Sequence, residues 1–244
     1  MTLNEAIDLR RSRRKYLPSP IDPAVIETLE ALAAQYSEAG NIRIEFVWND
    51  GGAFDGLRKT YGLLTGVRNY AGLIGPKGDP AAAERLGYYG ELLMLRAVAL
   101  GLGTCWVGGS LDRRLCPLPL AENEEIVCTI ALGPVQEKDS PREKLIYGVI
   151  HRKTKSIEEM METDAPPPPP WFLEGMKAAQ KAPSAVNRQP VKFSYKNGQV
   201  TAGVESGGTV SAMDLGIAKL HFELGAGQGK WAFGNHAAFD FTAK

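Results

Sequence analysis

The sequence contains little cysteine and no excess of either charge. Its 244 residues include three cysteines, and its 28 lysine and arginine residues are balanced by 28 aspartate and glutamate residues. An odd number of cysteines without metal-type spacing fits reduced thiols better than disulfides, so we interpret Cys105, Cys116 and Cys128 as small core residues and expect no metal site. The balanced charge disfavours wholesale nucleic-acid binding and leaves only local electrostatic roles.

Long apolar runs are also missing. No stretch is long enough to cross a bilayer, and no apolar run follows a charged start, so secretion and membrane insertion lack support and we expect a cytoplasmic protein. Apolar residues nevertheless make up 44% of the chain. That share can bury a substantial core, and the length suits either one large domain or two fused units.

Two apolar stretches predict the central helices of the fold. Residues Ala81 to Gly101 are apolar nearly all round and end at Gly101-Leu102-Gly103, which indicates a buried helix with a C-terminal glycine signal. Met213 to Gly225 repeats this pattern later in the chain. Further helices are expected from Thr2 to about Arg10, from Asp22 to about Gln35 and from Ile157 to Met161, and strands at Ile42–Trp48, Ile126–Leu132, Val191–Tyr195 and Gln199–Val204, with turns at Asn49–Gly52 and Lys196–Gly198.

A proline-rich segment divides the chain into two similar parts. Asp164 and Ala165 are followed by Pro166–Pro170, which is typical of a semi-rigid join. On both sides of it, helical, strand-and-turn and apolar-helix patterns and a glycine-containing stretch that ends in tryptophan occur in the same order. We therefore predict a duplicated unit with a first lobe at residues 1–163, a join at 164–170 and a second lobe at 171–244, whose central helices pack together.

The basic run Arg10-Arg11-Ser12-Arg13-Arg14-Lys15 admits three interpretations. It can be a solvated helix end. It can also bind an anion, because Arg10, Ser12 and Arg14 alternate along an extended segment and would point the same way, and guanidinium groups suit phosphate oxygens. A nucleic-acid-binding arm is the third interpretation, against which the neutral net charge and the lack of interleaved aromatic residues argue.

Two further stretches have the composition of ligand-contacting segments. The stretch Ala182–Phe193 begins with an Ala-Pro that stops a helix, offers hydroxyl, amide and backbone groups at close range, and contains a second proline that starts a strand. We predict that it is a binding edge. The stretch Thr104–Ser110 contains Gly108 and Gly109, which either do no more than end a structural element or permit close backbone approach to a flat ligand.

These pieces together resemble the FMN-dependent nitroreductase family. The matching motifs are Arg10–Arg14, the helix that leads into Gly101-Leu102-Gly103-Thr104-Cys105-Trp106, and Ala182-Pro183-Ser184-Ala185-Val186-Asn187-Arg188-Gln189-Pro190. The resemblance implies a nitroreductase-like α+β fold in which central apolar helices pack with mainly antiparallel sheets. In that family a homodimer holds FMN at the subunit interface, and the basic-Ser-basic segment and the Pro-Ser loop of one site come from different subunits.

The order of the motifs departs from the family pattern. The Pro-Ser-x-x-Asn loop is missing from its expected place around Tyr36 to Arg43 and appears in the second half of the chain. This arrangement resembles a homodimer fused into one chain, after which one of two equivalent sites was lost. The resemblance then implies one FMN per chain and a monomer built as an intramolecular pseudo-dimer, in which Arg14 and Asn187 close over the same flavin.

The resemblance also assigns roles to individual residues. Arg10, Arg11 and Ser12 would hold the FMN phosphate or ribityl chain, and Arg14 would lie toward the pyrimidine edge, where a cation stabilises reduced flavin. A backbone N–H of the segment Val107, Gly108 and Gly109 would lie near flavin N5. Further contacts would come from Arg152 and Lys153, for which surface solvation is the competing account, and from Pro183, Ser184, Ala185, Asn187 and Gln189.

The implied reaction is the flavin's own chemistry. NADH or NADPH would pass hydride to N5, and a small electrophile such as a nitroaromatic or a quinone would then take the electrons, with Arg14, Gly108 and Gly109 nearest the reacting atoms. No histidine needs a catalytic role, and His221 is expected to be a core or interface residue. The alternative is a flavin-binding protein without turnover, a store or a sensor, because no essential acid or base marks the active form.

Overall fold

The fold consists of two compact units, each built from discontinuous parts of the chain. The computed structural model describes residues 1–55, 64–138, 153–164, 167–205 and 208–242. The first unit comprises Met1–Thr2, Leu9–Lys77 and Leu93–Ile150, and the second comprises Leu3–Asp8, Gly78–Leu92 and His151–Lys244. The predicted lobes at 1–163 and 171–244 concern the duplication of the fold and stay a prediction.

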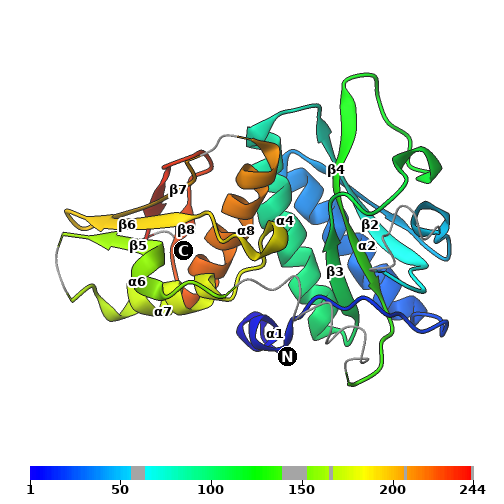
Figure 1. The fold of residues 1–244 in the computed structure, drawn as a ribbon, viewed down its shortest axis with the longest axis horizontal. Coiled ribbons are helices and arrows are strands. Elements are labelled where there is room, and N and C mark those ends of the chain that lie inside the picture. The colour runs from blue at the N-terminus through cyan, green and yellow to red at the C-terminus, as the bar shows by residue number, and fades with distance from the viewer. Residues whose placement is uncertain (56–63, 139–152, 165–166, 206–207, 243–244) are drawn as a thin grey trace. The chain divides into compact units, whose positions relative to one another are not determined.

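The first unit contains a four-stranded antiparallel sheet in the order β1-β2-β4-β3 (Figure 1). Its strands are β1 (Arg43–Val47), β2 (Asn69–Pro76), β3 (Gly103–Val107) and β4 (Glu124–Gly133). The strand predictions at β1 and β4 are confirmed. The predicted return turn at Asn49–Gly52 is wrong, because Gly52–Phe54 forms a short 3-10 helix and β2, the antiparallel partner of β1, begins only at Asn69.

Helix α2 (Pro23–Gly40) belongs to the same unit and begins where its capping residue predicts. The Asp22 side chain accepts a hydrogen bond from the Ala24 N–H at 2.9 Å, and Pro23 occupies the first helical position. The helix continues past the predicted end at Gln35 and stops at Gly40, where Asn41 adopts a left-handed conformation with φ 46°. Tyr36 is buried on this added turn, so packing extends the helix beyond its sequence signal.

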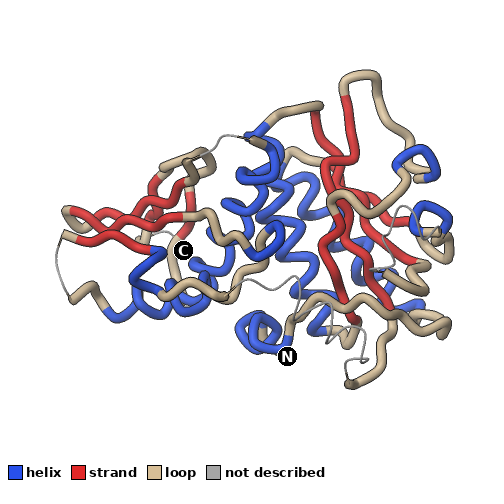
Figure 2. Tube along the Cα trace, viewed as in Figure 1, coloured by secondary structure: helices blue, strands red, loops and turns tan. Residues whose placement is uncertain are grey.

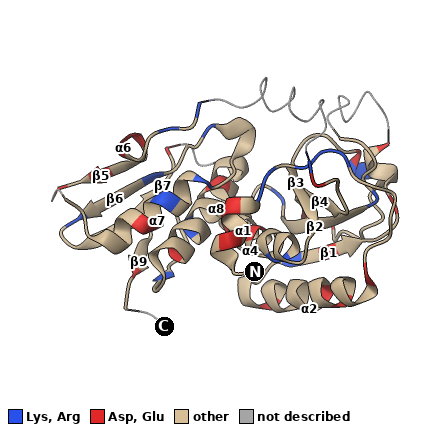
Figure 3. Ribbon diagram, turned by 90° about the horizontal axis from the view of Figure 1, so that it is seen from below, with Lys and Arg blue, Asp and Glu red and all other residues tan. Residues whose placement is uncertain are grey.

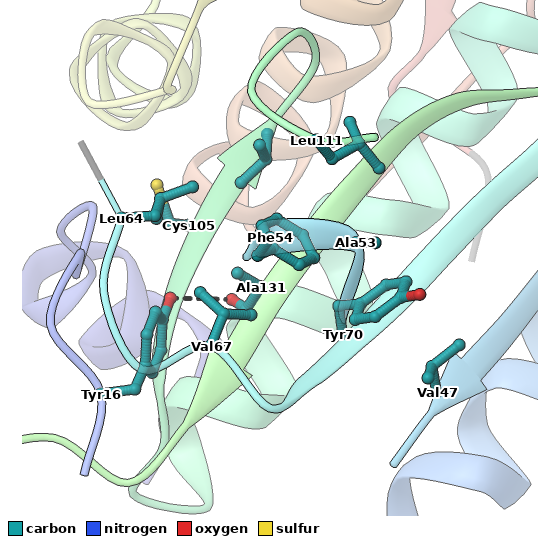
Figure 4. Close-up of a cluster of buried hydrophobic side chains, with 11 residues drawn as sticks. Tyr16, Val47, Ala53, Phe54, Leu64, Val67, Tyr70, Cys105, Leu111 and Ala131 are labelled. Carbon is teal, nitrogen blue, oxygen red and sulfur yellow. Dashed lines mark hydrogen bonds between the residues drawn. The ribbon is translucent and has the colours of Figure 1, made fainter. Parts of the chain in front are cut away.

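The core of the first unit combines aliphatic residues with a few aromatic residues (Figure 4). Phe54 packs edge-on against Tyr70 with ring centroids 5.1 Å apart. The hydroxyl of Tyr16 lies 3.1 Å from the Ala131 carbonyl and 2.9 Å from the Arg13 carbonyl, so it ties the N-terminal segment to β4. The end of β3 is thereby seated on a well-packed interior.

The second unit contains a five-stranded sheet in the order β5-β6-β7-β9-β8. Only the β5–β6 pair is parallel. The strands are β5 (Met161–Thr163), β6 (Lys192–Lys196), β7 (Gln199–Gly203), β8 (Lys230–Trp231) and β9 (Ala238–Asp240). The turn between β6 and β7 is confirmed: Asn197 and Gly198 both have positive φ, 51° and 75°.

The second unit also contains helices, blue in Figure 2. They are α1 (Leu3–Leu9), α6 (Ile157–Met160), α7 (Pro170–Gln180) and α8 (Thr209–Ala226), together with the first part of α4 (Pro80–Ala99), which the two units share. Pro170, predicted as the end of the join, is the first residue of α7. The long apolar helices predicted around α4 and α8 are both present.

Aromatic side chains gather around α8. Phe222 stacks on Phe193 with centroids 5.1 Å apart and packs edge-on against Phe172, Trp231 and Phe239. Such rings bury large apolar areas, so this cluster supplies much of the interior of the second unit.

Two glycines bring α4 and α8 into close contact within the second unit. A Cβ added to Gly216 would lie 1.9 Å from the Glu84 carbonyl oxygen, and one added to Gly87 would lie 2.2 Å from the Met213 carbonyl oxygen. Neither position has room for a side chain unless the helix backbones separate. The predicted packing of the two apolar helices is therefore seen here between backbone atoms.

Buried charged residues are paired along this contact. Lys219 is fully buried and donates to Glu84 at 2.6 Å and to the carbonyls of Ala232 and Gly234. His221 has Nε2 2.9 Å from the Glu91 carboxylate. His221 is therefore a core residue, as predicted.

The distribution of charged residues and the hydropathy of the helices agree with what the composition predicts. Basic and acidic residues, blue and red in Figure 3, are interspersed in both units. Within the described ranges, no helix combines the length and apolarity that a bilayer span requires.

Candidate functional site

The basic segment is extended and joined to the edge of the first unit's sheet. Ser12 bridges Thr104 of β3, and the Arg13 N–H donates to the Thr104 carbonyl at 2.8 Å. Arg13 is buried and donates to the Gln136 carbonyl, and Arg11 donates to the Glu137 carbonyl.

The predicted anion ligands belong to the same segment. Arg10, Ser12 and Arg14 are each half-buried. The Arg14 guanidinium turns back along the segment and donates to the Ser12 carbonyl at 3.2 Å. The structure thus brings Arg10, Ser12 and Arg14 together on one short strand-like segment, while Arg11 lies with Arg13. Their roles toward a cofactor stay predictions.

The glycine pair follows β3 directly. Val107 is buried, and its carbonyl accepts a hydrogen bond from the Thr129 hydroxyl at 3.0 Å, so the strand end is fixed. Neither Gly108 nor Gly109 has a positive φ. A Cβ on Gly109 would meet no atom within 4 Å, and one on Gly108 would meet only the Cys128 sulfur at 3.9 Å. Backbone conformation and packing therefore do not require glycine at these two positions, and close approach of a ligand to them stays a prediction.

Arg113 fixes the orientation of this pair and was not singled out from the sequence. Its guanidinium donates to the Gly108 carbonyl at 2.8 Å and to the Ile126 carbonyl of β4 at 3.1 Å. Because the peptide bond is planar and trans, the N–H of Gly109 points away from the Gly108 carbonyl and hence away from Arg113. An arginine six residues after β3 carried no sequence signal for this role.

The Ala182–Pro190 loop lies in the second unit and has an unusual backbone. Val186, Asn187 and Gln189 all have positive φ, at 46°, 51° and 46°. This region is unfavourable for a β-branched residue such as valine, and the Val186 side chain is 55% exposed. Exposed strain of this kind persists only where neighbouring contacts impose it, and it is typical of ligand-binding segments.

One end of the loop is held by Gln189, which is buried. Its side-chain amide accepts from the Lys155 N–H at 2.9 Å and donates to the Gln180 carbonyl at 3.1 Å, and its own N–H donates to the Ser184 hydroxyl at 2.9 Å. Gln189 was predicted to contact the cofactor. In the structure its amide is hydrogen-bonded to other protein groups. Among the described residues, these bonds stabilise the conformation of the loop.

The other end is held by Asp214 of α8. This carboxyl is 4% exposed, and its Oδ1 accepts from the Ala185 N–H at 3.0 Å. Burial raises the pKa of Asp214 to about 6, against which the Ala185 hydrogen bond and the Arg188 charge act. The sequence analysis did not identify Asp214, because a single acidic residue in an apolar helix gave no sign of what it faces.

The predicted site residues therefore fall into two groups, one in each unit. Arg10, Arg11, Ser12, Arg14, Val107, Gly108 and Gly109 belong to the first unit, and Lys153, Pro183, Ser184, Ala185, Asn187 and Gln189 to the second. The predicted closure of both groups over one flavin stays a prediction. Lys153 is exposed, and Arg152 lies outside the described residues.

Comparisons with known proteins point to one family. A family model described as "Putative TM nitroreductase" matches residues 2–226. The chain is similar to a crystal structure described as a "putative nitroreductase" from Thermotoga maritima, with a TM-score of 0.64 and 24% identity over 98% of this chain and 92% of that one. A comparison with curated proteins finds no match.

Two other solved structures are similar over a smaller part of this chain. One, from Desulfovibrio desulfuricans, is described as a "putative nitroreductase in complex with fmn"; its TM-score is 0.45 at 21% identity, over 59% of this chain and 95% of that one. The other is described as an FMN-dependent nitroreductase from Clostridium difficile; its TM-score is 0.43 at 18% identity, over 60% of this chain and 96% of that one. The predicted α+β fold with mainly antiparallel sheets is confirmed by the architecture and by the Thermotoga maritima structure.

Proposed function

The chain belongs to this nitroreductase family, as predicted, and we propose that it is an FMN-dependent oxidoreductase that passes hydride from NADH or NADPH to a small electrophile such as a nitroaromatic or a quinone. The observation that carries the proposal is the Ala182–Pro190 loop, whose strained backbone is imposed by anchors at both of its ends. The FMN named for two similar structures supports the choice of cofactor only through the family.

The residues present suit FMN. Arg10, Ser12 and Arg14 offer cationic and hydroxyl groups for a phosphate or ribityl chain, and guanidinium groups bind such oxygens through two parallel N–H donors. Gly109 offers a backbone N–H directed away from Arg113, with no side chain to keep a flat ring at a distance. When bound, FMN supplies the two-electron chemistry, accepting hydride from the nicotinamide donor and giving it to the electrophile.

The protein's own contribution is binding, orientation and electrostatics. Arg14 supplies positive charge toward the pyrimidine edge, and Ser184, Ala185 and Asn187 supply hydroxyl, amide and backbone groups from the second unit. Arg152 and Lys153 would add charge at the phosphate. The proposal includes one FMN per chain and a monomer built as a pseudo-dimer, with a small molecule rather than nucleic acid or membrane as its partner.

The visible spectrum of freshly purified protein tests the cofactor. We expect flavin absorption, and denaturation should release a compound with the mass of FMN. The amount released should correspond to one FMN per chain, and analytical ultracentrifugation gives the oligomeric state to which this stoichiometry applies. A colourless protein that binds no added FMN, or one that binds DNA with steep salt dependence, would contradict the proposal.

A variant pair tests the basic segment. Arg10→Ala removes a charge-assisted contact worth about 1.5 to 3 kcal/mol and should weaken FMN binding about ten- to a hundredfold. Arg96→Ala, which removes an exposed charge at the end of α4, is the matched control and should leave FMN affinity unchanged.

Turnover separates the enzyme from its alternative, a non-catalytic FMN store or sensor. Steady-state oxidation of NADH or NADPH with menadione or a nitroaromatic should be rapid if the protein is an oxidoreductase. A protein that binds FMN tightly but oxidises neither donor in the presence of either acceptor would instead be a store or sensor.

A further inference from the structure

The Ala182–Pro190 loop is held unequally at its two ends. Gln189 fixes the C-terminal end through several hydrogen bonds to half-buried protein groups. Toward the N-terminal end, the Ala182 N–H donates to the Ala179 carbonyl, and the Ala185 N–H donates to the Asp214 carboxylate of α8 at 3.0 Å. Between these anchors lie Val186 and Asn187 with positive φ, so release of the Asp214 contact would let the strained residues relax.

The Asp214 contact depends on the charge of the carboxyl. An ionised acceptor forms a hydrogen bond with a backbone N–H that is roughly twice as strong as a neutral one. The second oxygen of Asp214 is buried and has no hydrogen-bond partner among the described residues. The ionised form is therefore poorly solvated, and a proton can join it without breaking any other bond at that oxygen.

One charged group acts on Asp214, and most of the other charged groups of the neighbouring elements are bonded to partners of their own. Arg188, on the loop itself, favours the ionised form. Helix α4 carries Glu84, Tyr88 and Glu91, which are paired with Lys219, Glu223 and His221 farther along α8. Arg85 lies on the same stretch of α4 and is half-buried, and α7 ends with Lys177 bonded to Glu174 and Lys181 bonded to Asp8.

We propose that Asp214 is a positioning residue for FMN binding: its carboxylate holds the Ala185 N–H and keeps residues 184–187 in the conformation that binds the cofactor, and its protonation releases them. This inference rests on the proposed function, because it specifies how the loop of that same site is controlled. Asp214 itself need not touch the flavin.

A pH dependence follows from this role. Burial raises the pKa of Asp214 to about 6, so the carboxyl is ionised and holds the Ala185 N–H at pH 7.5 but is mostly protonated at pH 5. If the released loop binds poorly, a single group of this kind weakens FMN binding about tenfold between those two pH values. The sign is opposite to the effect on folding, because the protonated carboxyl is the form that tolerates burial.

The contact can be tested without any flavin. In the cofactor-free full chain, the NMR chemical shift of the Ala185 amide proton should titrate with a midpoint near pH 6, and the same signal should be flat in Asp214→Asn. The proposal is overturned if the Ala185 signal does not titrate, or if it titrates equally in Asp214→Asn.

Binding is tested with two flavins. FMN has a phosphate that titrates near pH 6, so riboflavin, which lacks it, separates the ligand's proton from the protein's. In wild type, the dissociation constant for riboflavin should rise about tenfold from pH 7.5 to pH 5. In Asp214→Asn it should already be raised several-fold at pH 7.5 and should change less than twofold with pH.

Two further variants keep the test decisive. Ala185→Pro removes the donor instead of the acceptor, and the extended Ser184, at φ −145° and ψ 161°, tolerates a following proline. It should lose the pH dependence as Asp214→Asn does. Glu223→Gln is the control, because Glu223 is also a buried acid of α8 but bonds Tyr88 and Lys230, and it should keep the wild-type profile.

The outcomes separate the two levels of inference. A wild-type pH profile in both Asp214→Asn and Ala185→Pro would overturn the positioning role while leaving the proposed function intact. Failure of every variant and of wild type to bind either flavin would overturn the proposed function and, with it, any role of Asp214 in flavin binding, even if the Ala185 amide titrates.

Discussion

The two units differ in where they keep charge. Among the described residues, the buried ionisable side chains of the first unit that are acidic or basic are Arg13 and Asp112, whereas the second unit buries Glu84, Glu91, Asp214, Lys219, His221 and Glu223. The first unit relies on a sheet with an uncharged interior. The second surrounds α8 with aromatic rings and, Asp214 apart, pairs its buried ionisable groups across the contact with α4. Buried charge therefore marks the helix contact of the second unit rather than the predicted anion site of the first.

The largest expected effect comes from breaking one ion pair in each unit, a fully buried pair in the second and a half-exposed pair in the first. Glu84→Ala leaves the fully buried Lys219 without its counter-charge and should cost about 3 to 5 kcal/mol of unfolding free energy. Asp112→Ala should cost only about 1 kcal/mol, because its partner Arg114 is 83% exposed and returns to water. Urea unfolding measures both, and equal costs would remove the contrast between the units.

The second comparison uses glycines. Gly216→Ala places a Cβ 1.9 Å from the Glu84 carbonyl oxygen and should cost about 2 to 3 kcal/mol. Gly109→Ala meets no atom within 4 Å and should change stability by less than about 0.5 kcal/mol while weakening FMN binding at least about tenfold. Thermal unfolding and flavin titration measure the two effects, and wild-type affinity in Gly109→Ala would count against the glycine pair as a flavin contact.

Asp214 of the second unit should make the stability of the protein depend on pH. The pKa of Asp214 is raised from 3.8 to about 6, so the folded state keeps a proton that the unfolded chain loses, and stability falls as pH rises between those values. Asp214→Asn removes this cost and should stabilise the protein by about 1 to 2 kcal/mol at pH 8.

At pH 3.5 the same variant should bring no gain, because the carboxyl is then protonated in both states. Urea unfolding at the two pH values measures the difference. Glu174→Gln, at an exposed position of α7, is the control and should be neutral at both. A gain of equal size at pH 3.5 and pH 8 would show that packing, not ionisation, is responsible.

The smallest expected effect concerns backbone strain. In the first unit the described non-glycine residues with positive φ are Asn41 and Asn49, whereas the second unit also places Val186 there. Asparagine tolerates this conformation, so Val186→Asn should stabilise the protein by about 0.5 to 1 kcal/mol. Val210→Asn, at an equally exposed valine of α8, should bring no gain. Differential scanning calorimetry resolves the pair.

The parts of the fold that could be predicted depend on local chemistry. The Asp22-Pro23 helix start and the Asn197-Gly198 turn follow from side-chain capping and from positive φ, and both are present. The family prediction succeeded for a related reason, because its motifs are short and contiguous. The pairing of β2 with β1 was not predicted because it joins residues far apart in the sequence. Strands β8 and β9 are too short to show the alternation of apolar and polar residues that indicates a strand.

The candidate site could be predicted only in part. Arg10, Ser12 and Arg14 are each half-buried on the segment that joins the edge of the sheet, and their shared role stays a prediction. Arg113 and Asp214 escaped notice because each acts through the backbone of another segment, on Gly108 and Ala185, and a backbone acceptor or donor leaves no mark on the sequence. Gln189 shows the converse: its motif position suggested a ligand contact, yet its amide is bonded within the protein.

The second unit draws Gly78–Leu92 from the middle of the chain, far ahead of the segment that begins at His151. During synthesis this helical piece leaves the ribosome well before α8 exists, and Glu84 has no Lys219 to meet until then. A fragment that begins at His151 would lack the α4 backbone at Glu84, against which Gly216 packs. The second unit therefore cannot be transferred to another protein as one continuous segment. Fragments that end or begin at the proline-rich join should be insoluble when expressed alone and soluble only when both are co-expressed.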